Sequence, residues 1–361
     1  MSQISLQLSA GTLLYKFQLI RRLGKGASGE VWLANDKTLA KEVALKIIPH
    51  DCADAIVASL NEAKIGNKFN HQNIVTMRYA DVVSVQNIPC VLIAMNYHKN
   101  GSITSRVNSG NFLPINELLP ILTDILRGLE YLHECHFYHN DIKPQNILIG
   151  SKGEGLLTDY GISCFSPSLQ PVSANSFYKL HASPEMITTR VADITSDIYQ
   201  MGMTAFRLLN GLSTLECKFN RHGENGYYQL TCQGKLIQSH DYLPFVPTGL
   251  KSILNRATDP DPQKRFLSCL KMRRAIEQLR YVGYWTTTSN GDFIGIQDGY
   301  EYRFVIDPVS KNSCHFDAFK KNITSSREVR ISAFSKKHIA LKETEQLKSK
   351  FMRWVVEGDK T

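Results

Sequence analysis

Four polar residues in the middle of the chain have the types and the spacing that phosphoryl transfer requires. Asp141 is followed by Lys143 and then by Asn146, and Asp159 lies 159 − 141 = 18 residues after the first of them. A carboxylate can accept the proton of a substrate hydroxyl, and a lysine can stabilise the migrating phosphoryl group. An amide oxygen and a second carboxylate can bind Mg²⁺. The pattern therefore predicts a site for phosphoryl transfer.

The residues on either side predict the elements that position this site. Apolar residues recur with helical spacing before it, at Leu118, Leu119, Leu122, Ile125, Leu129 and Leu132. After it, the apolar residues 147–149 predict a short strand, and Pro144 prevents a helix from running through. The site is therefore expected on a loop between a helix and a strand, with one short hairpin before Asp159.

A glycine-rich segment near the N-terminus predicts a hairpin that folds over phosphates. Its Gly-x-Gly-x-x-Gly pattern consists of Gly24, Gly26 and Gly29. The same pattern occurs in dinucleotide-binding turns, but there the last glycine opens a helix, whereas residues 30–34 read as a strand. The next strand, residues 43–48, is apolar except for Lys46, and a lysine inside such a strand needs a partner.

In their order, spacing and context these motifs resemble those of the eukaryotic-type serine/threonine protein kinases, over residues ~15–280. The resemblance implies an α+β, two-lobed fold with a small β-rich N-lobe and a larger helical C-lobe. It implies ATP and Mg²⁺ as cofactors. It also implies transfer of the γ-phosphoryl group to serine and threonine hydroxyls of proteins, with autophosphorylation. Lys143 followed by proline is the serine/threonine pattern, whereas Tyr178 stands where such kinases usually have threonine.

The resemblance assigns catalytic roles to four residues. Asp141 would be the catalytic base, and Lys143 would stabilise the transferred group. Lys46 would bind the α- and β-phosphates and form an ion pair with Glu62. Glu62 lies on a helix that we expect over residues 54–69.

The metal and nucleotide ligands follow from the same resemblance. Asn146 and Asp159 would bind Mg²⁺, and Met95 would be the gatekeeper at the back of the nucleotide pocket. The nucleotide itself would be bound by Gly24, Gly26, Gly29, Val31, Ala44, Lys46, Asn96, His98 and Leu148.

Two further polar contacts are implied. Asp197 would hold the backbone of the catalytic loop from below, although a helix N-cap is an alternative role for it. Glu185, in the Ser-Pro-Glu sequence that ends the activation segment, would form a buried ion pair with Arg265.

Three residues depart from the family pattern. Asn140 replaces an arginine that in relatives binds a phosphate on the activation segment, so activity is expected not to depend on phosphorylation of that segment. Tyr160 replaces a phenylalanine and adds a hydroxyl that needs a partner when it is buried. Gly66 replaces a larger apolar residue inside the helix of Glu62. We expect that helix to be held loosely, with Tyr160 filling part of the gap.

Two other classes of function remain open. A catalytically silent pseudokinase scaffold is disfavoured because Lys46, Asp141 and Asp159 are all present. A small-molecule kinase of related fold is disfavoured because such relatives usually lack the pair that Glu185 and Arg265 would form.

Length and composition fit a soluble, globular chain of more than one domain. The chain has 361 residues, of which 43% are hydrophobic and 21% are charged. We expect three domains. These are the N-lobe with the hinge (1–98), the C-lobe (99–280) and a small β/α module of unknown role (281–361). We expect no membrane span, no signal peptide and, from the scattered cysteines, no disulfide framework or zinc site. A cytoplasmic location is therefore expected.

The last segment matches no family pattern, but its elements can be predicted. Residues 285–288, 293–296 and 300–306 read as strands separated by turn residues. Leu347, Phe351 and Trp354 lie on one face of a closing helix. From residue 301 onward the net charge is 13 − 8 = +5. Nucleic acid is thus a candidate partner, but a solvated basic face is favoured, and the module is expected to pack on the C-lobe.

Overall fold

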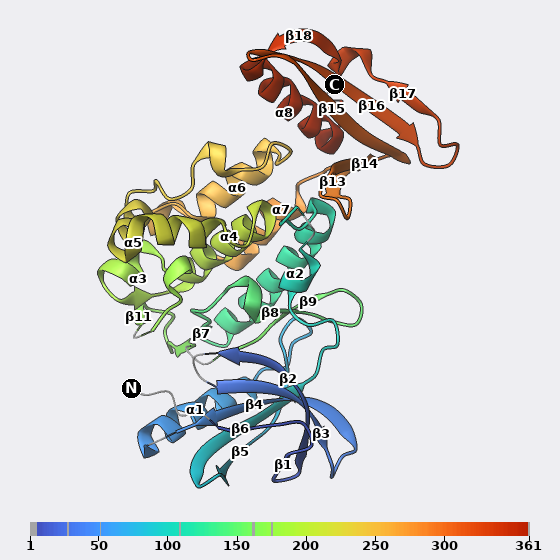
Figure 1. Cartoon of the computed structure of the whole chain (residues 1–361). Coiled ribbons are helices and arrows are strands. Elements are labelled where there is room, and N and C mark those ends of the chain that lie inside the picture. Colours follow the sequence, from blue (N-terminus) through green and yellow to red (C-terminus); the bar gives the residue numbers. More distant parts are fainter. Residues whose placement is uncertain are drawn as a thin grey trace.

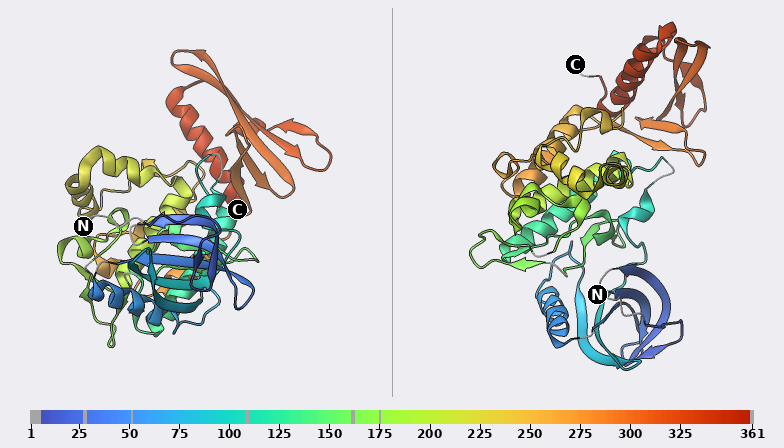
Figure 2. Two further views of the ribbon diagram at one scale, coloured as in Figure 1. Left: turned by 60° about the horizontal axis from the view of Figure 1, so that its bottom comes forward. Right: turned by 60° about the vertical axis from the view of Figure 1, so that its left-hand side comes forward.

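The structure is a computed structural model that describes residues 6–26, 29–50, 52–107, 110–160, 163–174 and 176–359. Within the first helix it does not describe the side chains at positions 58, 61, 62 and 65. Three parts lie in a row, with a β-rich lobe at one end, a helical lobe in the middle and a β/α module at the other end (Figure 1, and the right-hand view of Figure 2). The predicted two-lobed α+β fold is confirmed.

The β-rich lobe is built on one antiparallel sheet with strand order β1-β2-β3-β4-β6-β5. Its strands are β1 (Leu13–Leu14), β2 (Phe17–Gly26), β3 (Gly29–Asp36), β4 (Lys41–Pro49), β5 (Met77–Val85) and β6 (Ile88–Asn96). Burial is almost continuous along β4 and β6, which is the pattern of strands covered on both faces. Helix α1 (Ala53–Gly66) packs against β5 and β6.

Helix α1 ends earlier than the predicted helix over residues 54–69. Gly66 is its last residue, so the cost of a glycine inside a helix does not apply. A side chain at this position would collide with buried Met77 at the start of β5, whose atoms are the nearest to the place where it would begin. Tyr160 instead packs edge-on against Phe69 and His139. Met77, and not Tyr160 as we expected, therefore fills the gap.

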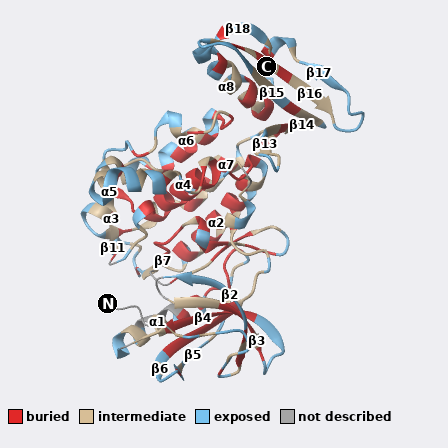
Figure 3. Ribbon diagram, in the orientation of Figure 1, coloured by how far each residue is buried: buried red, intermediate tan, exposed pale blue. Residues whose placement is uncertain are grey.

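The helical lobe is organised around α2 (Ile115–Glu134) and α4 (Ile194–Asn210). The other helices are α3 (Pro184–Thr188), α5 (Thr214–Cys232), α6 (Thr248–Ala257) and α7 (Cys269–Glu277). The short strands are β7 (Phe137–Tyr138), β8 (Ile147–Ile149), β9 (Gly155–Leu157), β10 (Cys164–Phe165), β11 (Val172–Ser173) and β12 (Val191–Ala192). Buried residues concentrate on α2 and α4 (Figure 3). The predicted apolar stripe of α2 lies in this core, with only Leu119 partly exposed.

The C-terminal module is an antiparallel sheet covered by one helix. Its elements are β13 (Gly283–Thr287), β14 (Phe293–Gln297), β15 (Tyr300–Ser310), β16 (Ser313–Asn322), β17 (Glu328–Arg330), β18 (Lys336–Ala340) and α8 (Leu341–Glu357). Phe351 of α8 is fully buried and packs edge-on against Trp285 of β13, so the predicted closing helix and its apolar face are confirmed.

The module packs on the helical lobe, as its sequence predicted. The ring of Phe293 stacks on Phe112 with 5.9 Å between centroids, and the backbone N–H of Gly110 donates to the Thr287 hydroxyl at 3.1 Å. Within the described ranges, no helix combines the length and the apolar character needed to cross a bilayer.

Candidate active site

The loop that carries the predicted catalytic residues is held in place by Asp197 of α4, through hydrogen bonds to the loop backbone. This fully buried carboxylate accepts the backbone N–H groups of His139 and Asn140, each at 2.8 Å, and lies 2.8 Å from Nε2 of His133. The N-cap of α4 is Asp193, which forms a capping box, so the alternative role of Asp197 as a helix cap is wrong. Asp197 binds the loop as the family resemblance implied.

Asp141 is held through one of its two carboxylate oxygens. Its Oδ2 accepts the Lys143 ammonium at 2.7 Å and the Asn146 side-chain amide at 2.9 Å. The same amide donates to the backbone carbonyl of Asp141 at 2.8 Å. Among the described residues, Oδ1 has no hydrogen-bond partner although it is buried. One oxygen is thus fixed, and the other is left to accept a proton.

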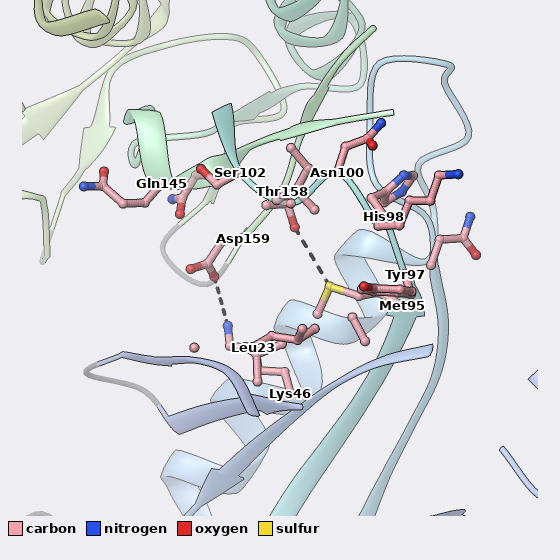
Figure 4. A pocket seen from close by; sticks show the side chains of 18 of the residues that line it. Leu23, Lys46, Met95, Tyr97, His98, Asn100, Ser102, Gln145, Thr158 and Asp159 are labelled. Carbon is pink, nitrogen blue, oxygen red and sulfur yellow. Dashed lines mark hydrogen bonds and ion pairs between the residues drawn. The ribbon is translucent and has the colours of Figure 1, made fainter. Parts of the chain in front are cut away.

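Lys46 and Asp159 meet across the cleft between the two lobes. Lys46 extends from β4, Asp159 follows β9, and their Nζ and Oδ1 atoms are 2.9 Å apart (Figure 4). The Lys46 side chain is only 8% exposed, in keeping with the expectation that a lysine on this strand has a partner. Asp159 has a φ of 68°, a left-handed conformation that aspartate tolerates better than most residues.

The two carboxylates of the cleft differ in acidity. Burial raises the pKa of Asp141 above its usual value, more than the Lys143 ammonium lowers it, and the Asp159 charge adds to the rise. Burial acts in the same direction on Asp159. There, the charge and hydrogen bond of Lys46, helped by Lys143 and His139, outweigh burial and hold the pKa below its usual value. Asp141 is therefore the more basic of the two carboxylates.

Beside these residues lies a pocket of about 610 Å³ with apolar walls. Ala44, Met95, Val31 and Leu148 belong to one hydrophobic cluster that spans both lobes and forms these walls. The end of β6 and the hinge that follows it supply the rim, which includes Asn96 and His98. Figure 4 shows His98 at this rim. A slot with apolar faces and backbone polar groups at its edge suits a flat heteroaromatic base.

The glycine-rich segment forms the predicted hairpin of β2 and β3, with Gly26 opposite Gly29. Gly29 has a φ of 144°, and a side chain there would collide with the backbone carbonyl of Ile47. Gly24 lines the pocket, whereas Gly26 and Gly29 do not. Residues 27–28, at the tip of the hairpin, lie outside the described residues.

One predicted pair cannot be placed. The backbone of Glu62 lies in α1, but its side chain is outside the described residues, so the predicted contact with Lys46 stays a prediction. The glycine of the Asp-Tyr-Gly motif, at position 161, is outside them as well. Tyr160 is buried, and its hydroxyl donates to the backbone carbonyl of Leu157 at 2.8 Å, so the predicted need for a partner is met.

Two contacts near the site were not anticipated. The side chain of Gln200 accepts the backbone N–H of Ile142 and donates to the carbonyl of Asn140, each at 2.8 Å. Its spacing of three from Asp197 puts both side chains on one helix face, a signal that could have revealed it. The other contact joins Arg21 of β2 to the hydroxyl of Tyr97 in the hinge at 2.9 Å. It depends on how the sheet packs over the hinge, which the sequence pattern does not encode.

The donor set fits a hard divalent cation. The Asn146 amide nitrogen is turned toward Asp141, which leaves its carbonyl oxygen as the available ligand. The depressed pKa of Asp159 keeps that carboxylate ionised. Carboxylate and amide oxygens are the ligands that Mg²⁺ prefers, usually together with phosphate oxygens and water.

The comparisons with known proteins agree with this geometry. The protein kinase domain family model matches residues 17–275, well over half of the 361 residues. The serine/threonine-protein kinase PrkC of Bacillus subtilis is 29% identical over 267 residues, covering 73% of this chain and 40% of that protein. The serine/threonine-protein kinase PknD of Chlamydia muridarum is 26% identical over 335 residues, covering 81% of this chain and 34% of that protein.

A plant relative is matched over more of its length. Mitogen-activated protein kinase kinase 2 of Arabidopsis thaliana is 30% identical over 263 residues, which cover 70% of this chain and 69% of that protein. The chain spans less than half the length of the two bacterial relatives. The domain match, the fold and the order of motifs along the cleft lead to one conclusion, that the chain belongs to the eukaryotic-type serine/threonine protein kinase family.

Proposed function

We propose that this chain transfers the γ-phosphoryl group of MgATP to serine and threonine hydroxyls of proteins, including its own. The observation that carries the proposal is the geometry of Asp141. One of its oxygens is held by Lys143 and Asn146, and the other has no partner among the described residues. This carboxylate adjoins a pocket that Lys46 and Asp159 help to line.

Each wall of the cleft has a role in binding ATP. The apolar cluster of Val31, Ala44 and Leu148 would sandwich the adenine, and the backbone of the hinge at Asn96 and His98 would pair with its edge. Lys46 would bind the α- and β-phosphates. Magnesium, held by Asn146 and Asp159, would neutralise charge on the phosphates.

The transfer itself would be carried by the catalytic loop. Asp141 orients the substrate hydroxyl and takes its proton through Oδ1 as the hydroxyl oxygen bonds to the γ-phosphorus. The bond between that phosphorus and the β–γ bridging oxygen breaks in the same transfer, and ADP leaves. Lys143, which is 2.7 Å from the other carboxylate oxygen, stabilises the negative charge on the transferred group. Because its pKa is raised, Asp141 is a better proton acceptor than an ordinary surface aspartate.

Phosphorylation of the activation segment would not be needed to form this site. The segment is held by backbone pairing of β10 with β7 and of β11 with β12. Buried Ser166 adds a hydrogen bond from its backbone N–H to the carbonyl of His136 at 2.8 Å. Asparagine at position 140 has no guanidinium with which to bind a phosphate on this segment, which supports the proposal.

Phosphoamino-acid analysis tests the proposed function. The purified chain is incubated with γ-labelled ATP, Mg²⁺ and a mixed protein substrate, next to the Asp159→Ala variant and a sample treated with chelator. We expect phosphoserine and phosphothreonine with the wild type only. Nucleotide binding without transfer would indicate a pseudokinase. Label confined to small molecules, or to phosphotyrosine, would contradict the proposed substrate class.

A further inference from the structure

The aromatic ring of Tyr178 covers the ammonium group of Lys143. Tyr178 lies at the end of the activation segment, and its ring centroid is 4.8 Å from Lys143 Nζ. The same Nζ donates to Asp141 at 2.7 Å, and the Lys143 side chain is 20% exposed. The ammonium therefore sits between the catalytic carboxylate and the negative face of an aromatic ring. Both neighbours attract a cation, and both restrict where it can go.

A buried arginine fixes the position of the ring. Arg207 of α4 is fully buried and donates from Nη1 to the Tyr178 hydroxyl at 3.3 Å. The remaining donors of Arg207 bond to the Leu212 carbonyl at 2.8 Å and to Glu216 at 2.7 Å. Because each of its three nitrogens has an acceptor, the guanidinium holds a fixed orientation, and so does the hydroxyl that it meets.

His181 ties the same arginine to the catalytic loop. Burial and the Arg207 charge lower the pKa of His181 to about 3, so the imidazole is neutral. Its Nε2 is 3.3 Å from Nη1 of Arg207 and must accept, so the proton lies on Nδ1, which donates to the Ile142 carbonyl at 2.8 Å. Ile142 lies between Asp141 and Lys143. One network thus fixes both the ring and the backbone next to the lysine that the ring covers.

We propose that Tyr178 is a positioning residue for Lys143, and that it acts through the face of its ring and not through its hydroxyl. The proposal rests on the proposed function, because it concerns the lysine that would stabilise the transferred group. Lysine has a long flexible chain, so without the ring its ammonium would sample positions away from Asp141. The threonine that related kinases usually have at this position has no ring and could restrain Lys143 only by a hydrogen bond.

Three substitutions of Tyr178 separate the effect of the aromatic ring from the effects of the hydroxyl and of side-chain size. Tyr178→Phe keeps the ring and loses the contact with Arg207. Tyr178→Leu loses the same contact, keeps an apolar side chain and has no aromatic face. Tyr178→Thr installs the usual hydroxyl without a ring. Each variant is assayed for kcat and KM with peptide and ATP, for ATP hydrolysis without peptide, and for thermal stability. Tyr228→Leu, a partly buried tyrosine of α5, serves as the matched control for the loss of an aromatic side chain.

We expect Tyr178→Phe to retain kcat within about three-fold, although it loses thermal stability because a buried Arg207 donor is left unpaired. Tyr178→Leu should lower kcat about ten-fold, with an equal fall in ATP hydrolysis and little change in the KM for ATP. Tyr178→Thr should behave like Tyr178→Leu. The loss of ATP hydrolysis matters because it shows an effect on Lys143 that does not depend on peptide binding.

Two results would overturn the proposal. If the phenylalanine and leucine variants lose kcat equally, the hydroxyl or the structure of the segment is what matters. If the leucine variant keeps kcat, the ring has no role in positioning Lys143. Failure of the proposed function looks different, because the wild type itself would then show no transfer. The comparison among variants is made only against an active wild type, so the two failures cannot be confused.

Discussion

Asp141 and Asp159 are carboxylates of one cleft whose surroundings move their pKa values in opposite directions. Such a division supports the proposed roles, because a proton acceptor benefits from higher basicity and a metal ligand must stay ionised. The spacing of these residues with Lys143 and Asn146 was sufficient to predict that they contribute to one site. The direction of the two shifts was not predictable, since it depends on burial at Asp141 and, at Asp159, on Lys46, which lies 113 residues earlier in the chain.

The pH dependence of kcat/KM tests the proton acceptor. Asp141 must be ionised to act, so activity is lost as pH falls through its pKa. Because burial raises that pKa, the acidic limb should lie above the range of an exposed aspartate. Lys143 lowers the pKa of Asp141, so Lys143→Gln should move the limb to still higher pH in addition to reducing the rate. The exposed Lys152→Gln is the control. A limb that stays in place in the Lys143 variant would show that another group titrates.

At the scale of elements, α1 shows where sequence reasoning failed. The glycine at position 66 was correctly singled out, but the helix ends at this residue, and Met77 from the neighbouring strand occupies the space beside it. Which side chain fills such a gap depends on the packing of β5 against α1, so the sequence of either segment alone does not predict it. With the space filled, the expectation of a loosely held helix loses its physical reason.

A double-mutant cycle measures this packing. Gly66→Leu should destabilise the protein by about 1–3 kcal/mol, because the new side chain and Met77 compete for one space. Met77→Ala should cost about 2–5 kcal/mol by leaving a cavity. The double variant should recover part of both losses, since the leucine can then fill the cavity. Denaturant unfolding gives the three free energies. Strict additivity would mean that the two side chains do not share the space.

The activation segment is a second element whose predicted behaviour can be tested. Asn140 cannot bind a phosphate as an arginine does, and the segment is held by strand pairing with β7 and β12. Phosphatase-treated protein should therefore keep most of its kinase rate. Alanine at the exposed serines Ser168 and Ser173 should likewise leave the rate within about two-fold, because surface substitutions of this kind seldom disturb a fold. Loss of activity on dephosphorylation, restored by rephosphorylation, would show that another cation binds a phosphate there.

At the scale of the whole molecule, three parts share contacts along a continuous core. The hydrophobic cluster around α2 extends to Trp285 and Phe351 of the C-terminal module, which docks through Phe293 and Phe112. The strands and the closing helix of this module were predictable, because their apolar residues follow the periods of strands and helices. Its docking site was not, since neither Phe112 nor Phe293 is marked by any local pattern.

The ion pair between Glu185 and Arg265, unlike the docking site of the module, could be predicted from the sequence. It joins segments 265 − 185 = 80 residues apart, yet it was expected from the family resemblance, and the structure gives distances of 2.8 and 2.9 Å for its two hydrogen bonds. Long-range contacts were therefore predictable where a known pattern names both partners. Contacts for which no known pattern names both partners, such as Arg21 with Tyr97, were found only in the structure.

The most direct measurement of the central claim is the transfer of label from γ-labelled ATP by Asp141→Asn, paired with nucleotide binding followed by thermal shift. Asparagine keeps the size of the side chain but cannot take a proton, and the nucleotide pocket is unchanged. We predict that transfer falls by at least about a hundred-fold while the thermal shift with ATP and Mg²⁺ stays at the wild-type level. An Asp141→Asn protein that phosphorylates itself and its substrates at the wild-type rate would contradict the account.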